Sequence, residues 1–451
     1  MRSRFPGPPG SVVGRYLGAA IAATVALLGV AHAQGGAGRL NAQSPGLAWG
    51  PATVRPTVIF NYGYTDNIFY ASSDLSLETP LASREGQIQP GIRFDLPFGE
   101  SYLQGGYSAL YRNYSTDDYT PTSQWSHYFD LDGHLRAGAR GYFNLRDRFV
   151  RGSQELREVD PGGELTFGDL PFRSHTPSVE AGVDFGLRQG MSILWNYSSS
   201  QYSDIEGLGF SNFRGHGFQA RYNYKIRPEA SGYLYYGTDT MVQTRDEGDL
   251  NYDGTGVGLG YTQRVGRAIT TQVAAGYQVL EATGVVDSSY HGPTATGSAS
   301  WAVGDTTRLN LGVRRQPFQS FFLNNAYYLN RGVSLELMHQ VSLSGYWRVM
   351  VGLDQNAYSD ELDVTGFESL YCADDGNGGL VCPSAGVRRR DRGWHTELGF
   401  GAQLSRVSRW YLGYNRDSRT SNLLAADADG FGDPFAYDTN RYFFRIEVGW
   451  L

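Results

Sequence analysis

Apolar or aromatic residues recur at every second position along most of the chain, with small or polar residues between them. The segment "GQIQPGIRFDLPF" (86–98) places Ile88, Ile92 and Phe94 on one side and charged or amide residues on the other. The same alternation recurs in "QVAAGYQV" from residue 272, "TRLNLGVRRQ" from residue 307 and "WHTELGFGAQL" from residue 394. A period of two residues predicts β-strands with one apolar and one polar face.

Short and long connections alternate between these predicted strands. Tight turns are expected at 97–101, 136–140, 187–191, 227–230, 265–268, 304–306, 343–346 and 406–409. The connections between them are longer and rich in Asp, Asn, Gly and Ser, as at 153–171, 358–391 and 421–437. Eight short turns and nine long loops give about eighteen strands, while a count of sixteen stays open. Together with apolar-out, polar-in strands, this asymmetry predicts an all-β fold, a transmembrane antiparallel up-and-down β-barrel, closed because lipid offers no partner to an open edge.

Tryptophan positions provide an independent indication of a membrane barrel. All of the tryptophans considered fall on the apolar parity, close to one or other end of a predicted strand. Those beside short turns are Trp301, Trp347, Trp410 and Trp450. Those beside long loops are Trp125 and Trp394. Two aromatic girdles at the two membrane interfaces are expected for an outer-membrane barrel.

The last segment, "NRYFFRIEVGWL" (440–451), is itself a predicted strand. Tyr442, Phe444 and Ile446 share the apolar parity with Trp450. Such aromatic final strands resemble those of barrels inserted by the outer-membrane assembly machinery, which this resemblance implies as a partner. The chain departs from that pattern by one residue, because Leu451 follows the outward aromatic.

The amino terminus has the features of a secretory signal peptide over residues 1–33. Arg2, Arg4 and Arg15 precede or flank an apolar stretch at 17–30, and "AHA" at 31–33 precedes the expected cleavage point. We expect a short periplasmic segment at 34–53 and an outer-membrane β-barrel at 54–451, in a Gram-negative bacterium. Export also favours a disulfide between the only two cysteines, Cys372 and Cys382.

The polar parity predicts the composition of the pore wall. Basic and acidic side chains are almost balanced along it, which disfavours a strongly ion-selective ring. Either these charges form cross-strand pairs that stiffen the wall, or they form a hydrophilic track for an uncharged or mixed-charge solute. The predicted wall contains Arg93, Asp95, Arg112, Asp130, Asp132, Arg136, Arg146, Arg148, Glu180, Asp184, Arg221, Lys225, Arg264, Arg308, Arg314, Glu336, Arg348, Asp354, Glu397, Asp417, Arg445 and Glu447.

Two further features concern the same inner face. Tyr102, Tyr128, Tyr142, Tyr411 and Phe443 fall on the inward parity, where they either fill space or stack on sugar rings. Glycines at 254, 256, 258 and 260 repeat with period two. We expect this strip to mark a sharp bend of the sheet or a place where an inserted loop packs closely.

The sequence offers no recognisable catalytic constellation, so we expect no enzyme activity and no cofactor. It lacks the nucleophile-elbow, zinc-protease, phosphate-loop and C-x-x-C motifs. Asp130, Asp132 and His134 share one strand face but are better explained as lumen wall. Oxygen-rich segments in "CADDGNGGLVC" (372–382) and "DADGFGD" (427–433) lack the full calcium-loop spacing, so no metal site is predicted. A chain of 45 acidic and 38 basic residues also argues against nucleic-acid binding.

The first predicted strand, "RPTVIFNYGYTDNIFYASS" (55–73), carries a more specific signal. Its end, "YTDNIF", resembles the outer-membrane β-barrel family found with exopolysaccharide and capsule gene clusters, in which a similar D/N-N-I-F/Y follows strand one. The resemblance is specific over residues 55–72 and otherwise rests on architecture. It implies a passive pore for a secreted polysaccharide, working beside a periplasmic polysaccharide-export lipoprotein.

Two functional hypotheses follow from the sequence. The main hypothesis is a channel for secretion of an exopolysaccharide or capsular polysaccharide. The alternative is a general or solute-specific diffusion porin. Occlusion of the lumen separates them, because diffusion porins keep an inward-folded loop; the candidate segments are 153–171 and 358–391.

Overall fold

The computed structural model describes residues 46–68, 70–72, 80–115, 125–153, 171–202, 212–245, 248–320, 325–365, 368–374, 379–427 and 430–449. The predicted signal peptide, most of the segment at 34–53, Phe69, the bulk of the loop at 153–171, and Trp450 lie outside these residues.

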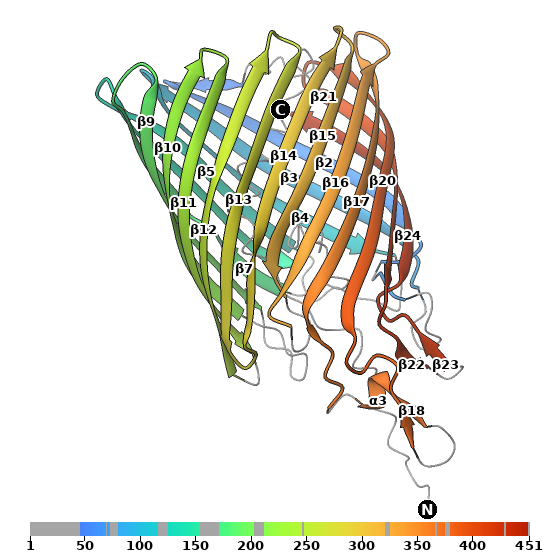
Figure 1. The fold of residues 1–451 in the computed structure, drawn as a ribbon. Coiled ribbons are helices and arrows are strands. Elements are labelled where there is room, and N and C mark those ends of the chain that lie inside the picture. The colour runs from blue at the N-terminus through green and yellow to red at the C-terminus, as the bar shows by residue number, and fades with distance from the viewer. Residues whose placement is uncertain are drawn as a thin grey trace, which may run out of the picture.

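Eighteen long strands form one closed antiparallel sheet, tilted against the barrel axis (Figure 1). In chain order they are β2 (Ala52–Thr65), β3 (Ser83–Phe98), β4 (Ser101–Tyr114), β5 (Trp125–Ala137), β6 (Gly141–Ser153), β7 (Pro171–His175) with β8 (Ser178–Asp184), β9 (Gln189–Tyr202), β10 (Asn212–Arg227), β11 (Ala230–Arg245), β12 (Gly248–Val265), β13 (Ile269–Gly284), β14 (Ser288–Val303), β15 (Thr307–Gln319), β16 (Tyr327–Gln340), β17 (Gly345–Glu361), β20 (Arg388–Ser405), β21 (Ser408–Ser421) and β24 (Tyr437–Gly449). The segments β7 and β8 count as one strand because each lies between β6 and β9.

The barrel closes where β2 pairs with β24. The pairing runs from Thr57 opposite Gly449 to Thr65 opposite Arg441. On its other side β2 pairs with β3, so no edge is left open between the first and last strands. A closed sheet satisfies the backbone of every spanning strand, as lipid requires. The predicted fold class is confirmed, with eighteen strands rather than sixteen.

The two ends of the barrel differ in their connections, with two exceptions to the predicted alternation. Short turns join strands at one end; that between β3 and β4 contains Gly99 at φ 64°, a conformation that favours glycine. At the other end, β12 begins at Gly248, three positions after the end of β11 at Arg245, and β14 begins at Ser288, four positions after the end of β13 at Gly284. The expectation that every connection at that end is long is therefore wrong for β11–β12 and β13–β14.

Small elements gather beyond the long-loop end (Figure 1). The single-turn helix α3 (Glu368–Tyr371) and the hairpin of β18 (Ala373–Asp374) and β19 (Leu380–Val381) lie between β17 and β20. A second hairpin, β22 (Ala425–Asp427) with β23 (Gly430–Gly432), lies between β21 and β24. At the amino-terminal side, β1 (Leu47–Trp49) pairs with β2. No helix in the described part of the chain is both long and apolar enough to cross a membrane.

The outer surface carries the apolar face of the strands, as burial shows. Phe60 and Tyr62 in β2 are 46% and 57% exposed, whereas Asn61 between them is 8% exposed. The described tryptophans of the predicted girdles all share the outward parity: Trp125, Trp301, Trp347, Trp394 and Trp410. Sequence reasoning left out Trp195, which also faces outward but lies midway along β9. An apolar outer face on a closed sheet is the architecture of an outer-membrane β-barrel, in agreement with the predicted location.

Candidate functional site: the inner wall and the outer mouth

The inward face can be followed from strand to strand through the pairing register. Asn61 lies opposite Arg445 on one side and Gln87 on the other, and its amide donates to the Gln87 side chain at 3.2 Å. Continued around the barrel, this parity includes every residue of the predicted wall. That a solute passes along these side chains stays a prediction.

One part of the wall is a connected ladder of ion pairs on β16, β17 and β20. The Arg348 guanidinium donates from Nε to Glu336 and from Nη1 to Glu397 Oε1, the latter at 2.8 Å. Asn310 on β15 donates to Glu336 at 2.8 Å, and the Tyr411 hydroxyl on β21 donates to Glu397 at 2.7 Å. One cation thus serves two carboxylates, which neutral donors stabilise from either side.

Further pairs neutralise charge on neighbouring strands. Arg441 donates to Glu85 at 2.7 Å across β24 and β3, and Arg314 donates to Asp354 at 2.7 Å. Arg55 pairs with Asp95, and Arg409 pairs with Glu447, in the same manner. Much of the predicted wall is therefore compensated within the protein, and the lack of a strongly ion-selective ring stays a prediction.

A different stretch of wall, on β3 to β6, exposes its charges. The Asp132–Arg146 pair has an O–N separation of 2.9 Å, but its side chains are 37% and 51% exposed. Arg93, Asp130 and Arg148 are likewise exposed although they point inward. Accessible inward charges of both signs show that the barrel interior is hollow at this height and offers a polar surface.

Inward aromatic side chains lie flat on glycines of the neighbouring strand. The Tyr233 ring occupies the space where a Cβ at Gly260 would lie, and the Tyr235 hydroxyl comes within 2.6 Å of the corresponding point at Gly258. The Tyr411 ring covers Gly399 in the same way. The glycine strip at 254–260 therefore accommodates side chains of β11, whereas a sharp bend or an inserted loop at this place stays a prediction. The periodic glycines indicated that another part of the chain approaches their backbone closely, but they did not indicate which part.

At the outer mouth, the described end of the connection between β15 and β16, Asn325 and Ala326, packs against the inner wall, a feature that sequence reasoning missed. Ala326 in this connection is fully buried, and its carbonyl accepts a hydrogen bond from the Tyr252 hydroxyl on β12 at 2.9 Å. β12 is three strands away from β15, so Ala326 lies against the inner face of the intervening strands. It packs on inward apolar side chains at the outer ends of β10 to β14: Phe213, Met241, Leu250, Tyr252, Leu280, Ala282 and Tyr290.

A carboxylate at the end of β17 holds this connection in place. Asp360 accepts from the Ala326 backbone at 3.4 Å and from the Ser288 hydroxyl on β14 at 3.1 Å. Its own backbone N–H donates to the Asn325 side chain at 3.0 Å. We call Asp360 with Asn325 and Ala326 the β15–β16 anchor.

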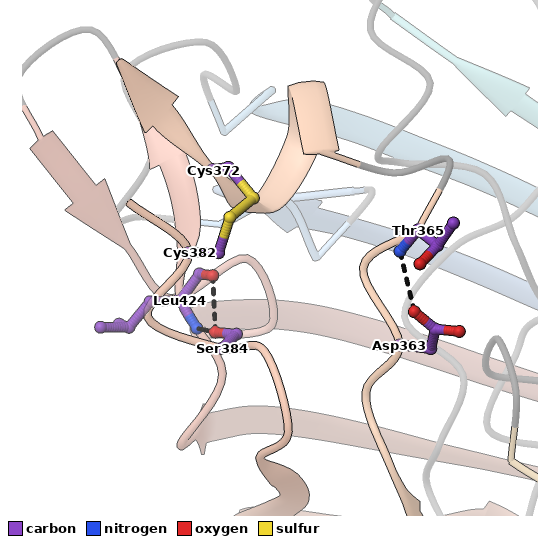
Figure 2. The surroundings of a disulfide bond; sticks show 6 residues. All are labelled: Asp363, Thr365, Cys372, Cys382, Ser384 and Leu424. Carbon is purple, nitrogen blue, oxygen red and sulfur yellow. Dashed lines mark hydrogen bonds between the residues drawn. A yellow bond between two sulfur atoms is a disulfide. The ribbon is translucent and has the colours of Figure 1, made fainter. Parts of the chain in front are cut away.

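The predicted disulfide lies in a second group of loops at the mouth. Cys372 and Cys382 are joined by a disulfide beside α3 (Figure 2). The same loop is tied to the connection between β21 and β24, because the Ser384 hydroxyl donates to the Leu424 carbonyl at 2.7 Å and accepts from the Leu424 N–H at 2.6 Å (Figure 2). We call the two connections together, 362–387 and 422–436, the docked loops.

The docked loops cover inward-facing side chains at the ends of β15 to β17. Tyr371 and Leu423 of the loops pack on Phe318, Tyr328 and Tyr358. Beneath them Arg389 and Arg419 both pair with Asp391, and all three side chains are almost fully buried. A buried network of this kind is costly unless every member is satisfied, so this side of the mouth has a defined structure.

Asp433 ties the docked loops to the end of β21. Its carboxylate accepts from the backbone N–H of Ser421 and, at 2.9 Å, from that of Phe435. Burial raises the pKa of Asp433 to about 6, against the effect of these two hydrogen bonds.

Among the described residues, the candidate catalytic and metal-binding groups do not come together as a site. Asp132 pairs with Arg146, and His134 hydrogen-bonds to Asn144 at 2.7 Å. Two members of the predicted Asp130, Asp132 and His134 group therefore bind neighbouring side chains of the wall. The part of the chain that the structure describes holds no group of three or more His, Cys, Asp or Glu residues able to bind a metal ion. The oxygen-rich positions 375–378 and 428–429 lie outside the described residues.

Comparisons with known proteins add the following. No family model matches the chain, and no curated protein is similar in sequence. Among solved structures, the chain is similar to the outer membrane protein OpdK of Pseudomonas aeruginosa, with 12% identity, TM-score 0.44 and coverage of 88% of this chain and 99% of that one. It is also similar to OccAB2 of Acinetobacter baumannii, with 9% identity, TM-score 0.45 and coverage of 88% and 98%. None of these matches ties the chain to polysaccharide export, so the resemblance of residues 55–72 stays a prediction.

Proposed function

We propose that the protein is a diffusion channel for small hydrophilic solutes. The observation that carries the proposal is the outer mouth, where the β15–β16 anchor and the docked loops pack over the inner faces of the strands. Below them lies a polar wall with exposed charges of both signs. A narrowed mouth above a mixed-charge wall suits small neutral or zwitterionic solutes and opposes free passage of a long polymer.

The polysaccharide-secretion hypothesis has less support in the geometry. It rested on the motif after strand one, and the described residues of that motif contribute to barrel closure. Asp66 bonds to Asn440 of the last strand, and Asn67 bonds to Ala71 within its own loop. A motif that helps to close the sheet does not favour one transported molecule over another.

Swelling of proteoliposomes containing the purified protein tests the proposal. We expect monosaccharides and amino acids to enter, with rates that fall steeply as solute size increases. Replacing Asp360 by Ala removes the carboxylate of the β15–β16 anchor and should raise the rate for the larger solutes several-fold. Asp305→Ala, in the exposed short turn between β14 and β15, is the matched control and should change nothing.

Two results would contradict the proposal. If no small solute enters, and deletion of the gene abolishes surface polysaccharide while solute uptake stays normal, the secretion hypothesis replaces the proposal. If Asp360→Ala admits no larger solute although the barrel is folded, the mouth does not set the size limit.

A further inference from the structure

Three arginines lie in one row on the outward face of neighbouring strands. The register places Arg315 of β15 opposite Arg331 of β16, Arg331 opposite Gln355 of β17, and Gln355 opposite Arg392 of β20. We call these four residues the arginine row. With neighbouring strands about 4.8 Å apart, the row spans about 14 Å around the barrel.

The residues below the row establish that it faces lipid. Two positions further down each strand lie Val313, Val333, Leu353 and Trp394, which are also paired in register. The three aliphatic side chains are 44%, 49% and 57% exposed, as expected on the outer surface of a barrel. Below them follow three more outward rows: Leu311, Leu335, Val351 and Thr396; Leu309, Leu337, Val349 and Leu398; then Thr307, His339, Trp347 and Phe400.

The height of the row follows from the same register. Trp347 in the lowest of these rows lies beside the short-turn end, at the inner interface. From residue 347 to residue 355 the strand rises about 27 Å along its length, which a tilt of about 40° reduces to roughly 20 Å along the membrane normal. The apolar band of such barrels is about 25 Å tall, so the backbone of the row lies about 5 Å below the interface of the outer leaflet, a distance that an arginine side chain spans.

The charges of the row have no compensation within the described protein. None of its three guanidinium groups forms an ion pair with a described carboxylate, in contrast to the outward Arg416, which pairs with Asp438 at 3.5 Å. Arg315 donates from Nε to the Pro293 carbonyl at 3.1 Å, which orients its remaining donors. Arg331 and Arg392 are exposed.

The rim is not uniformly cationic. On β12 and β13 the outward positions at the same end include acidic residues, since Asp253 lies opposite Glu281. A partner attracted to the arginine row is therefore anionic. It would bind beside β15 to β20 and not around the whole rim of the barrel. Guanidinium groups match phosphate oxygens through paired N–H donors, and they do so well at a boundary of low dielectric.

We propose that the arginine row binds phosphate groups of an anionic lipid headgroup in the outer leaflet. The acyl chains would lie along the aliphatic rows below, and the indole of Trp394 would lie at the level of the headgroup linkage. Three cations within about 14 Å suit a headgroup that carries more than one phosphate. The binding is independent of what passes through the barrel.

The test uses the full-length protein, folded in a zwitterionic detergent and titrated with lipopolysaccharide as the phosphate-bearing probe. A cation at the membrane surface contributes about 1 kcal/mol to the binding of an anionic lipid, so each arginine that contacts a phosphate within the row contributes about fivefold in affinity. We therefore expect Arg331→Gln to weaken binding about fivefold, and the triple replacement of Arg315, Arg331 and Arg392 by Gln to weaken it on the order of a hundredfold. The matched control is Arg214→Gln, an outward arginine at the same end of β10 whose strand neighbours are Ser199 and Val242; it should bind as the parent does.

Two further arms keep the proposal falsifiable. Dephosphorylated lipopolysaccharide should bind the parent protein as weakly as the intact probe binds the triple variant, and inorganic phosphate alone should bind far more weakly than the lipid. Folding is checked for each variant by the heat-dependent gel mobility of closed barrels. If the triple variant does not fold, the single Arg331→Gln variant provides the test. Unchanged binding by a folded arginine-row variant, or tight binding of the dephosphorylated probe, would overturn the proposal.

Discussion

Asp66 accepts two hydrogen bonds from Asn440, one from the backbone N–H and one from the side-chain amide, both at 2.7 Å. Asp66 follows the end of β2, and Asn440 lies in β24, so this pair fastens the first strand to the last. Next to it, the Thr439 hydroxyl donates to the Asn67 carbonyl at 3.2 Å. The Asn67 amide then holds Ala71 through two bonds of 2.9 Å. The loop after strand one is thereby bound to the seam of the barrel.

Loss of the Asp66 carboxylate should weaken this closure. Asp66→Ala removes two charge-assisted hydrogen bonds and leaves the Asn440 donors without their acceptor. Bonds to charged groups contribute about 1.5–3 kcal/mol each, with incomplete additivity. We expect the free energy of unfolding in urea to fall by about 2–4 kcal/mol, measured by the heat-dependent gel shift or by tryptophan fluorescence in detergent.

A neighbouring carboxylate supplies the control for this prediction. Asp438 lies two positions before Asn440, and its side chain is 51% exposed in a 3.5 Å pair with Arg416. An exposed pair contributes about 0–1 kcal/mol, so Asp438→Ala should have little effect. Equal effects of the two replacements would contradict a specific role of Asp66 in closure.

The Arg348 ladder makes a prediction about ion selectivity. Arg348→Gln leaves Glu336 and Glu397 without their shared cation on the inward face. If these residues line the path of solutes, the reversal potential in a salt gradient should shift towards cation selectivity. The uncompensated carboxylates should also lower the free energy of unfolding by about 3 kcal/mol.

Arg93 provides the comparison for that experiment. It is exposed on the inner face of β3, opposite Gly106, and no ion pair joins it to a described residue. Arg93→Gln should change the reversal potential in the same direction without loss of stability. A reversal potential unchanged in both variants would show that ions do not pass along this wall.

The β-barrel was predictable because strand parity is a local property. The alternation in segments such as 86–98 already separates Ile92 from Arg93, and closure follows from the requirements of lipid. The register of Arg348 between Glu336 and Glu397 was not predictable, because it depends on how far each strand is shifted against the next. Parity could therefore assign these residues to the wall but could not pair them.

The mouth was the least predictable part of the structure. The length of 358–391 drew attention to that loop, yet the β15–β16 connection gave no such signal. Its fold depends on the hydroxyl of Tyr252, which comes from a strand 74 residues earlier. A contact of this kind becomes visible only when neighbouring strands are placed around the barrel. The glycine strip is a similar case, since its partners Tyr233 and Tyr235 lie on the preceding strand.

The disulfide should control the order of the docked loops. In the chain-entropy description, a cross-link over ten residues contributes about 2–3 kcal/mol, and Cys372–Cys382 closes such a segment. Replacement of both cysteines by Ser should make 362–387 more sensitive to protease and should raise single-channel conductance. A reductant should act on the parent in the same way and leave the double variant unchanged. Identical conductance with and without the bond would show that these loops do not narrow the mouth.

Asp433 should make the docking of the loops pH-dependent. Its pKa is raised to about 6 by burial, so the folded loop binds a proton more tightly than the unfolded chain, in which the ordinary value is 3.8. The docked state therefore gains stability as the pH falls from above 6 towards 4, and loses it as the pH rises. Hydrogen exchange at the Phe435 and Ser421 amides, corrected for the intrinsic rate, should show greater protection at pH 5 than at pH 7.5. Asp433→Asn, which cannot ionise, should keep the protection constant across this range, whereas a parent that shows greater protection at pH 7.5 would mean that the two backbone hydrogen bonds outweigh burial.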